Sequence, residues 1–402
     1  MYELLSLRQS PNALAEHYSL FGVSRRLLLT GHSHQAWPDV GFKAQQQAWR
    51  DAAELVDDKW DRAFQKFERV CRGYDALLGS PGGDVTLAPN THELVVRFLS
   101  ALDLGKRPRL VTTDAEFHSI RRQLDRLAEE GWVEVVKVEG YPAWGAAERL
   151  AAAVDDRTAA VLASAVFFER GVIVPGLSRV AEACERHGAA FLVDAYHALG
   201  AVPFELGLQG LEGAFVVGGG YKYLQLGEGN CFLRTPEGCD LRPVYTGWFS
   251  EFAELGDVKA PGEVPYGRGW ARFAGSTFDP TSQYRGAAVM DFFQERGLTP
   301  DFLRVVSEHQ VRLLALTFQG LDLDPGIVRL DETVRMEQRG GFLSLHAPEA
   351  ARLSAALKGQ GVHTDARGDV LRFGPAPYLS DEQIVEAMEA LGDVARRFSP
   401  PA

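Results

Sequence analysis

The sequence predicts an α/β protein with a large domain built on a mostly parallel sheet and a smaller α+β domain after it. The first observation is the alternation of strand-like apolar runs and helical periodicity between residues 85 and 234, which is typical of a sheet covered on both faces. The second is a stretch rich in glycine and proline, residues 245–282, with little periodicity. The third is the return of helical spacing beyond it, with candidate strands at 341–346 and 370–373.

The predicted elements follow in order from the N-terminus. A short apolar run at 27–30 leads into a loop at 31–38, and helical spacing continues over 40–78. The predicted strands then cover residues 85–88, 109–113, 133–138, 159–164, 190–194, 213–217 and 230–234. The predicted helices cover residues 92–102, 119–130, 177–187, 284–296 and 300–319. We divide the chain into an N-terminal arm with an active-site loop (1–45), a large domain (46–290) and a small C-terminal domain (291–402).

Composition excludes several classes of protein. The 402 residues are 46% hydrophobic and 24% charged, which is ordinary for a globular protein large enough for two domains. The net charge of −12 argues against nucleic acid or an anionic membrane as the main partner. No apolar run approaches the ~18–20 residues of a membrane span, and the first residues do not resemble a signal peptide. The four cysteines have no metal-ligand spacing, so we expect reduced thiols in a cytoplasmic protein.

Two residues carry the main functional hypothesis. Asp194 ends an apolar strand-like run, and Lys222 follows the glycine run 218–220. Alone, the aspartate could cap a helix and the lysine could be an ordinary surface charge. Together they are what pyridoxal 5′-phosphate requires: a lysine amine that binds the aldehyde, and a carboxylate that keeps the pyridine nitrogen protonated. We predict that both are catalytic.

Four further residues fit such a cofactor. Asn90 and Thr91 are good N-cap residues for the predicted helix that follows, whose free N–H groups could hold a phosphate, although ordinary capping explains the segment equally well. Phe117 could stack on a planar ring or simply belong to the core. His197 could contact the ring or be a structural histidine. These assignments depend on the cofactor that Lys222 and Asp194 suggest.

The N-terminal loop and the last predicted strand supply other candidates. His32 and His34 lack a nearby carboxylate or thiolate in the sequence, so we predict no metal and expect their loop to reach the mouth of the active site. Arg372 lies within an apolar strand, where its guanidinium could bind a substrate carboxylate. A structural ion pair is the alternative.

The motifs resemble a known family. Residues 193–203 (Val-Asp-Ala-Tyr-His-Ala-Leu-Gly-Ala-Val-Pro) and 220–224 (Gly-Tyr-Lys-Tyr-Leu) are similar to kynureninase and the wider class V aminotransferase group, which are fold-type I pyridoxal phosphate enzymes. The Gly-Glu-Gly at 227–229 is typical of the kynureninase side. The resemblance extends from Gly31 to Gly374.

The resemblance implies roles for individual residues. Lys222 would form the Schiff base, Asp194 would contact the pyridine nitrogen, and Trp248, Ser276 and Thr277 would reach the phosphate from a neighbouring subunit of a homodimer. The implied cofactor-binding set is Thr91, His92, Phe117, Asp194, His197, Tyr221, Lys222, Trp248, Ser276 and Thr277. The implied substrate-binding set is Arg372, His32 and Ser33.

The implied activity is kynureninase-like: hydrolytic Cβ–Cγ cleavage of a kynurenine-type amino acid, giving alanine. A class V aminotransferase, a related lyase and a non-catalytic cofactor-binding protein remain alternatives. A cysteine desulfurase would need a cysteine in the C-terminal part, and no cysteine follows Cys239. The chain departs from the family pattern at residues 31–35 (Gly-His-Ser-His-Gln in place of Gly-Asn-Ser-Leu-Gly), at Glu251, where a histidine is usual, and at 278–280. These positions approach the substrate, so the substrate stays open.

Overall fold

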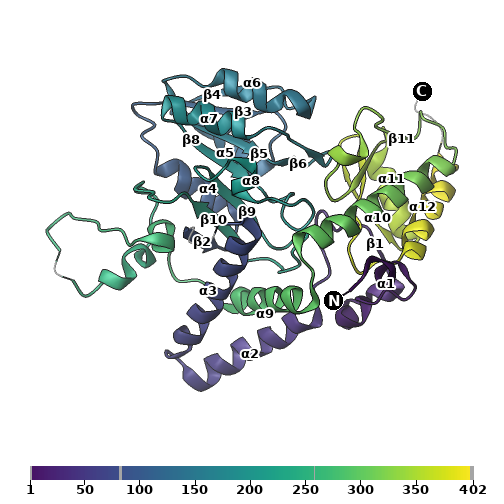
Figure 1. The fold of residues 1–402 in the computed structure, drawn as a ribbon, viewed down its shortest axis with the longest axis horizontal. Helices are drawn as coiled ribbons and strands as arrows, with labels where there is room; N and C mark the ends of the chain where they lie inside the picture. The colour runs from purple at the N-terminus through teal and green to yellow at the C-terminus, as the bar shows by residue number, and fades with distance from the viewer. Residues whose placement is uncertain (1, 81–83, 258, 399–402) are drawn as a thin grey trace.

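The computed structural model (Figure 1) describes residues 2–80, 84–257 and 259–398. A seven-stranded sheet in the order β2-β10-β9-β8-β5-β3-β4 forms the centre of the large domain. Its strands are β2 (Asp84–Ala88), β3 (Arg109–Thr113), β4 (Glu134–Val138), β5 (Thr158–Ser164), β8 (Ala190–Asp194), β9 (Phe215–Gly219) and β10 (Cys231–Thr235). All neighbours from β4 to β9 run parallel, and β10 runs antiparallel to both of its neighbours. The mostly parallel α/β fold predicted from the sequence is confirmed.

Helices cover both faces of this sheet, as the alternation predicted. One face packs against α4 (Thr91–Ser100) and α5 (His118–Glu129), and the other against α3 (Lys59–Leu78), α6 (Ala146–Ala153) and α7 (Ser178–His187). In β8, Phe191 and Val193 belong to the core under α3, α6 and α7, whereas Leu192 belongs to the core under α4 and α5. Because side chains alternate along a strand, Asp194 points toward the α4/α5 face.

The small domain contains a four-stranded antiparallel sheet in the order β11-β12-β15-β14. These strands are β11 (Arg329–Leu330), β12 (Leu343–His346), β14 (Asp365–Arg367) and β15 (Val370–Phe373), and the helices are α10 (Pro300–Gly320), α11 (Ala350–Gly359) and α12 (Asp381–Ala395). A capping box starts α12: the Ser380 hydroxyl accepts from the Gln383 N–H, and the Gln383 side chain accepts from the Ser380 N–H.

The N-terminal arm packs with the small domain. It contains α1 (Leu4–Arg8), η1 (Ala15–Phe21), η2 (Val23–Arg25) and β1 (Leu27–Leu28). Leu14 and Tyr18 lie in the same core as Leu314 and Phe373, and β1 pairs in parallel with β13 (Val362–His363). Figure 1 shows the purple N-terminal segment beside the yellow C-terminal elements. The two ends of the chain therefore build one domain.

The structure breaks one predicted helical span in two. The helical span 40–78 is two helices, α2 (Asp39–Leu55) and α3, because the chain breaks at Val56, whose φ is +54°. The predicted domain boundary after residue 290 falls inside α9 (Thr281–Arg296), which packs against α2 and α3 of the large domain. α9 ends at Gly297, whose φ of +70° is the left-handed conformation of a helix C-cap.

In the described part of the glycine-rich segment 245–282, the short helices η4 (Trp248–Glu254) and η5 (Gly269–Phe273) are the helices that precede α9. Part of it projects from the large domain at the left of Figure 1, and its exposed side chains include Tyr245, Trp248, Phe252 and Leu255.

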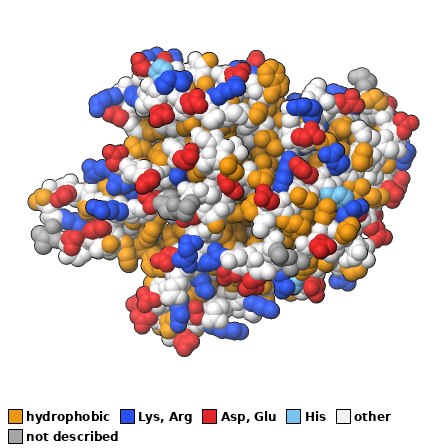
Figure 2. Space-filling view, viewed as in Figure 1, with side chains coloured by type: hydrophobic (Ala, Val, Ile, Leu, Met, Phe, Trp, Pro, Cys, Tyr) orange, Lys and Arg blue, Asp and Glu red, His pale blue; other side chains and the backbone are white. Residues whose placement is uncertain are grey.

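The remaining short elements are η3 (Ala143–Gly145), β6 (Val166–Phe167), β7 (Val172–Ile173), α8 (Leu206–Gln209) and η6 (Met336–Gln338). Over the described residues, no helix combines the length and apolarity that crossing a membrane requires. Hydrophobic side chains gather along the line between the domains on the face shown in Figure 2.

Candidate active site

Lys222 lies in a tight turn just after β9, at the carboxyl end of the sheet. The glycines before it are required by close packing: a Cβ at Gly219 would collide with the Tyr196 ring, and one at Gly220 would collide with the Leu226 side chain. The lysine opens onto a cavity of about 450 Å³. Ligands of open parallel sheets bind at this end of the strands.

The structure brings seven of the ten predicted cofactor-binding residues around this cavity. They are Thr91, His92, Phe117, Asp194, His197, Tyr221 and Lys222. Ser164, Tyr196 and Cys231 also line it, and sequence reasoning missed them. Ser164 could have been found, because it ends a predicted apolar strand just as Asp194 does.

Burial makes the Lys222 amine reactive. The side chain is 5% exposed, and its Nζ lies 2.8 Å from His197 Nε2 and 4.5 Å from the centre of the Tyr196 ring. Burial lowers the Lys222 pKa to about 7, although the charge of Asp194 acts in the opposite direction. Burial and the Lys222 charge also hold the His197 pKa well below its ordinary value. A large share of the amine is therefore uncharged at neutral pH.

The Asp194 carboxylate can accept further hydrogen bonds. It is 7% exposed, and its Oδ1 accepts a hydrogen bond of 2.8 Å from the Tyr196 N–H. Burial raises the Asp194 pKa, while that hydrogen bond and the Lys222 charge lower it. A buried carboxylate is stabilised by a cationic partner, and a protonated pyridine ring is one.

The opposite end of the cavity suits a phosphate. α4 begins there, and the side chain of its N-cap residue Asn90 accepts from the Glu93 N–H at 2.9 Å. Thr91 Oγ1 is buried without a hydrogen-bond partner among the described residues, and the same holds for His197 Nδ1. Hydroxyl and amide donors at a helix N-terminus are typical phosphate ligands. The residues present thus fit the aldehyde, ring and phosphate of pyridoxal phosphate.

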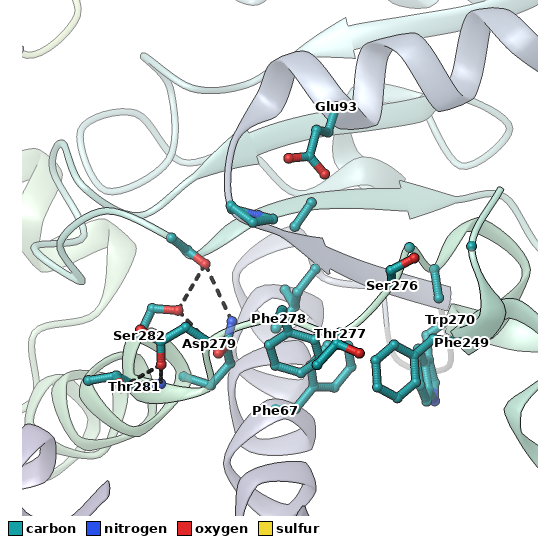
Figure 3. Close-up of a pocket in the computed structure, with 18 of the residues that line it drawn as sticks. Phe67, Glu93, Phe249, Trp270, Ser276, Thr277, Phe278, Asp279, Thr281 and Ser282 are labelled. Atoms are coloured by element: carbon teal, nitrogen blue, oxygen red, sulfur yellow. Dashed lines mark hydrogen bonds between the residues drawn. The ribbon is translucent and has the colours of Figure 1, made fainter. Parts of the chain in front are cut away.

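Three predicted cofactor residues lie elsewhere in their own chain. Ser276 and Thr277 line a second cavity of about 700 Å³ (Figure 3), and the exposed Trp248 donates from Nε1 to Thr277 Oγ1 at 3.3 Å. Figure 3 shows Ser276 and Thr277 across the cavity from Glu93. The two cavities share a wall formed by Pro89, Glu228 and Gly229.

Arg372 already has a partner in this structure. The side chain is 3% exposed, its Nη2 lies 2.8 Å from Asp365 Oδ2, and its Nη1 donates to the Phe168 carbonyl at 2.7 Å. The ion pair that sequence reasoning kept as an alternative is present. Burial lowers the Arg372 pKa, and Asp365 opposes that effect.

The N-terminal loop packs between the domains. His32 is 1% exposed, stacks 4.5 Å from the Phe342 ring and lies 3.9 Å from Asp365, but it does not line the Lys222 cavity. The Ser33 hydroxyl lies 3.1 Å from His34 Nδ1, and the His34 ring stacks on Tyr221. No three or more His, Cys, Asp or Glu side chains of the described ranges gather as metal ligands do.

Two family models match the chain. One described as Aminotransferase class-V matches residues 89–225, and one described as Kynureninase C-terminal domain matches residues 306–391. Kynureninase of Burkholderia pseudomallei is 28% identical over 98% of this chain and 94% of its own length. Kynureninase of Deinococcus radiodurans is 26% identical over 89% and 84%, and the uncharacterized aminotransferase YcbU of Bacillus subtilis is 21% identical over 86% and 88%.

Solved structures share the fold. The cysteine desulfurase of Thermococcus onnurineus has a TM-score of 0.79 at 15% identity and covers 97% of this chain and 99% of its own. A C-DES variant with glycine covalently linked to its PLP cofactor has a TM-score of 0.78 at 17% identity, over 94% and 98%.

The fold, with its lysine and aspartate at one end of the sheet, defines a fold-type I enzyme dependent on pyridoxal phosphate. Both family models cover parts of that architecture, and together they span more than half of the chain. The two matches and the kynureninase relatives support a kynureninase-like class V aminotransferase.

Proposed function

We propose that the protein is a hydrolase that cleaves the Cβ–Cγ bond of a kynurenine-type amino acid and releases alanine. The observation that carries this proposal is the Kynureninase C-terminal domain match over residues 306–391, which contains Arg372. The kynureninase relatives, aligned over most of their own length, support it. The Lys222 cavity supplies the groups that the chemistry needs.

Pyridoxal phosphate, when bound, supplies an aldehyde for amines and a ring that draws electron density from the substrate α-carbon. Lys222 would hold that aldehyde, and its amine, with a pKa of about 7, would be suited to take the α-proton of the substrate. Asp194 would keep the ring nitrogen protonated. His197 orients Lys222 Nζ through their 2.8 Å contact. Phe117 and Tyr196 form apolar walls that exclude water.

Arg372 is the proposed ligand of the substrate α-carboxylate, as the resemblance implies. Asp365 fixes its guanidinium at 2.8 Å, and the Phe168 carbonyl fixes the other nitrogen. The Arg372 Nε is buried and has no hydrogen-bond partner in the described part of the chain, so one donor stays available. His32 and Ser33 are also proposed to lie on the substrate side, where they shape the site through the packing of their loop.

The second candidate is a class V aminotransferase. The aminotransferase relative from Bacillus subtilis favours it, as do the departures at residues 31–35 and at Glu251, which lie on the substrate side of the family pattern. An aminotransferase would need a keto acid to complete its cycle, whereas a hydrolase would need only water. The requirement for a keto acid therefore distinguishes the aminotransferase from the hydrolase.

The test uses purified protein loaded with pyridoxal phosphate. It is incubated with kynurenine, 3-hydroxykynurenine and a panel of amino acids, each with and without pyruvate or 2-oxoglutarate. Anthranilate fluorescence and alanine release without a keto acid are expected. Turnover that depends on the keto acid establishes the aminotransferase instead, and a Lys222→Ala control must be inactive in either case. Cofactor binding with no reaction towards any amino acid contradicts both candidates.

We further propose that the enzyme is a cytoplasmic homodimer whose partner subunit completes each active site. Supporting this, Ser276 and Thr277 lie outside the Lys222 cavity of their own chain, and the exposed side chains of the 245–282 segment include Trp248 and Phe252. Mixing two inactive variants, Lys222→Ala and Ser276→Trp, should restore roughly a quarter of the activity, because half the dimers would then hold one intact site. A monomer by light scattering, or no recovery on mixing, contradicts the dimer.

A further inference from the structure

A second arginine lies beside Arg372 on the small sheet. Asp365 and Arg372 are Cα partners in the antiparallel β14–β15 register, and Arg367 follows two residues after Asp365 on β14. Because side chains alternate along a strand, all three charged side chains emerge on the same face of this sheet. The opposite face carries Leu371 and Phe373, which belong to the core of the small domain. The three charged side chains are therefore directed away from that core.

This charged face is turned toward the large domain. Arg372 Nη1 donates to the Phe168 carbonyl at 2.7 Å, and Phe168 lines the Lys222 cavity. The Arg367 side chain is 50% exposed, as surface arginines commonly are. Its strand face, however, is the one that approaches the proposed cofactor site.

The charge of Arg367 acts on residues of the large domain. Burial is the main cause of the Lys222 pKa of about 7, and the charges of Arg372 and Arg367 act in the same direction. Burial and the Arg121 charge lower the His118 pKa, and the Arg367 charge adds to that effect. Because charges near a protein surface are screened over short distances, Arg367 must lie close to both groups.

The Arg367 guanidinium has free hydrogen-bond donors. Over the described residues it forms no hydrogen bond, and its one ion pair is loose, with 3.7 Å between its Nη2 and Asp365 Oδ2. Arg372 Nη2 lies 2.8 Å from the same oxygen of Asp365. One carboxylate oxygen therefore already lies between the two guanidinium groups, which shows that their spacing suits a carboxylate.

The charges of these side chains do not balance. Arg367 and Arg372 each carry a positive charge, and Asp365 supplies one negative charge. His32 lies 3.9 Å from Asp365 but adds no charge at neutral pH, because burial and the Arg372 charge hold its pKa well below the ordinary value. One substrate carboxylate would neutralise the excess positive charge, and Arg367 has an unused fork of donors to bind it.

We infer that Arg367 is a second substrate-binding arginine, which binds the α-carboxylate of the amino acid together with Arg372. The inference rests on the proposed function and adds a residue that neither the motifs nor the cavity lining identified. Asp365 keeps the two guanidinium groups at the spacing of a carboxylate. The substrates are then free α-amino acids, and amides or amines that lack the carboxylate charge bind poorly.

The test compares kynurenine with kynurenine amide, which lacks the α-carboxylate charge, on the protein loaded with pyridoxal phosphate. Arg367→Ala should raise the KM for kynurenine roughly tenfold, the effect of one charge-assisted hydrogen bond, and leave kcat within about twofold. The inhibition constant of the amide should not change. Arg367→Lys keeps the charge but loses the fork, so its KM should fall between those of the wild type and Arg367→Ala. If the panel identifies another amino acid as the substrate, that amino acid and its amide are used.

Arg352→Ala is the matched control. Arg352 lies on α11 of the same domain, its side chain is 71% exposed, and it pairs with Glu349. Its removal changes the net charge by the same amount, so the KM for kynurenine should stay within about twofold of the wild type. An equal rise of KM in Arg352→Ala and Arg367→Ala would reduce the effect to long-range charge and overturn the inference.

Other outcomes would also overturn the inference. An unchanged KM in Arg367→Ala would show that the arginine does not contact the substrate. Equal losses for kynurenine and its amide would place Arg367 at another part of the substrate. A fall in kcat or in pyridoxal phosphate affinity at unchanged KM would assign it to the cofactor. A wild-type protein that reacts with no amino acid would contradict the proposed function itself, and this failure appears before any variant is compared.

Discussion

The lowered pKa of Lys222 makes a quantitative prediction. In the cofactor-free protein, a pKa of about 7 in place of 10.5 leaves about half of the amine unprotonated at pH 7. An ordinary lysine would have on the order of a thousandfold less free amine at that pH. The difference corresponds to about 5 kcal/mol of preference for the neutral form, which follows from burying the side chain.

Competitive labelling measures this directly. The cofactor-free protein is treated with a trace of acetic anhydride between pH 5 and 11, and the acetylation of each lysine is quantified by mass spectrometry. The pH of half-maximal labelling reports the pKa whatever the absolute rate, so restricted access to the cavity does not distort it. Lys106, whose side chain is 85% exposed and whose pKa is raised by the hydrogen bond with Asp103, is the internal reference.

Lys222 should reach half-maximal labelling near pH 7, and Lys106 at a much higher pH, because the hydrogen bond with Asp103 raises its pKa. Asp194→Asn should move the Lys222 midpoint lower still, because the Asp194 charge raises the Lys222 pKa. A Lys222 midpoint above pH 9 would refute the reasoning, since the amine would then be solvated like an ordinary lysine. A rise in Asp194→Asn would refute the assigned sign of the interaction.

Three further perturbations test neighbouring parts of the structure. Lys222→Met should raise the melting temperature of the cofactor-free protein at pH 7 but hardly at pH 10.5. Between these pH values the unfolded chain binds a proton at Lys222 that the folded chain does not, so the buried lysine destabilises the fold at pH 7 and much less at pH 10.5. Equal effects at both pH values would contradict the burial of this amine. Asp194→Ala should weaken pyridoxal phosphate binding by at least about tenfold, measured by equilibrium dialysis, since a charged hydrogen bond is lost; unchanged binding would remove its assigned role. Arg372→Ala should lower the melting temperature, because Asp365, whose side chain is 12% exposed, then keeps only the longer contacts with Arg367 at 3.7 Å and His32 at 3.9 Å; adding Asp365→Ala should recover part of the loss. No recovery would mean that the Asp365 charge does not destabilise the Arg372→Ala protein.

Much of the fold could be predicted from local patterns. The parallel strands are continuous apolar runs bounded by turn residues, and such runs are distinctive when both faces of a sheet are covered. The break between α2 and α3 escaped prediction because Val56 adopts a positive φ that valine rarely accepts, so no glycine or proline marked it. The packing of the N-terminal arm on the small domain depends on pairing between β1 and β13, more than 300 residues apart, which no local pattern reveals.

Local sequence patterns likewise predicted some residues of the active site and not others. Asp194 and Lys222 could be singled out because Asp194 ends a strand-like apolar run and Lys222 follows a glycine run, and the topology then brings them to one cavity. Tyr196 could not, because its surroundings depend on a three-dimensional contact with β10. The identity of the Arg372 ion-pair partner was likewise hidden, since β14 supplies Asp365 in a register that sequence alone does not fix.

Because the arm returns to the small domain, the polypeptide crosses between the two lobes twice, once near Pro38 and once near Gly297. A domain that one segment connects can rotate about many axes, whereas a domain that two segments connect rotates mainly about the line that joins them. Any approach of Arg372 toward Lys222 would therefore follow a single arc, and stiffening either crossing would restrain the whole lobe.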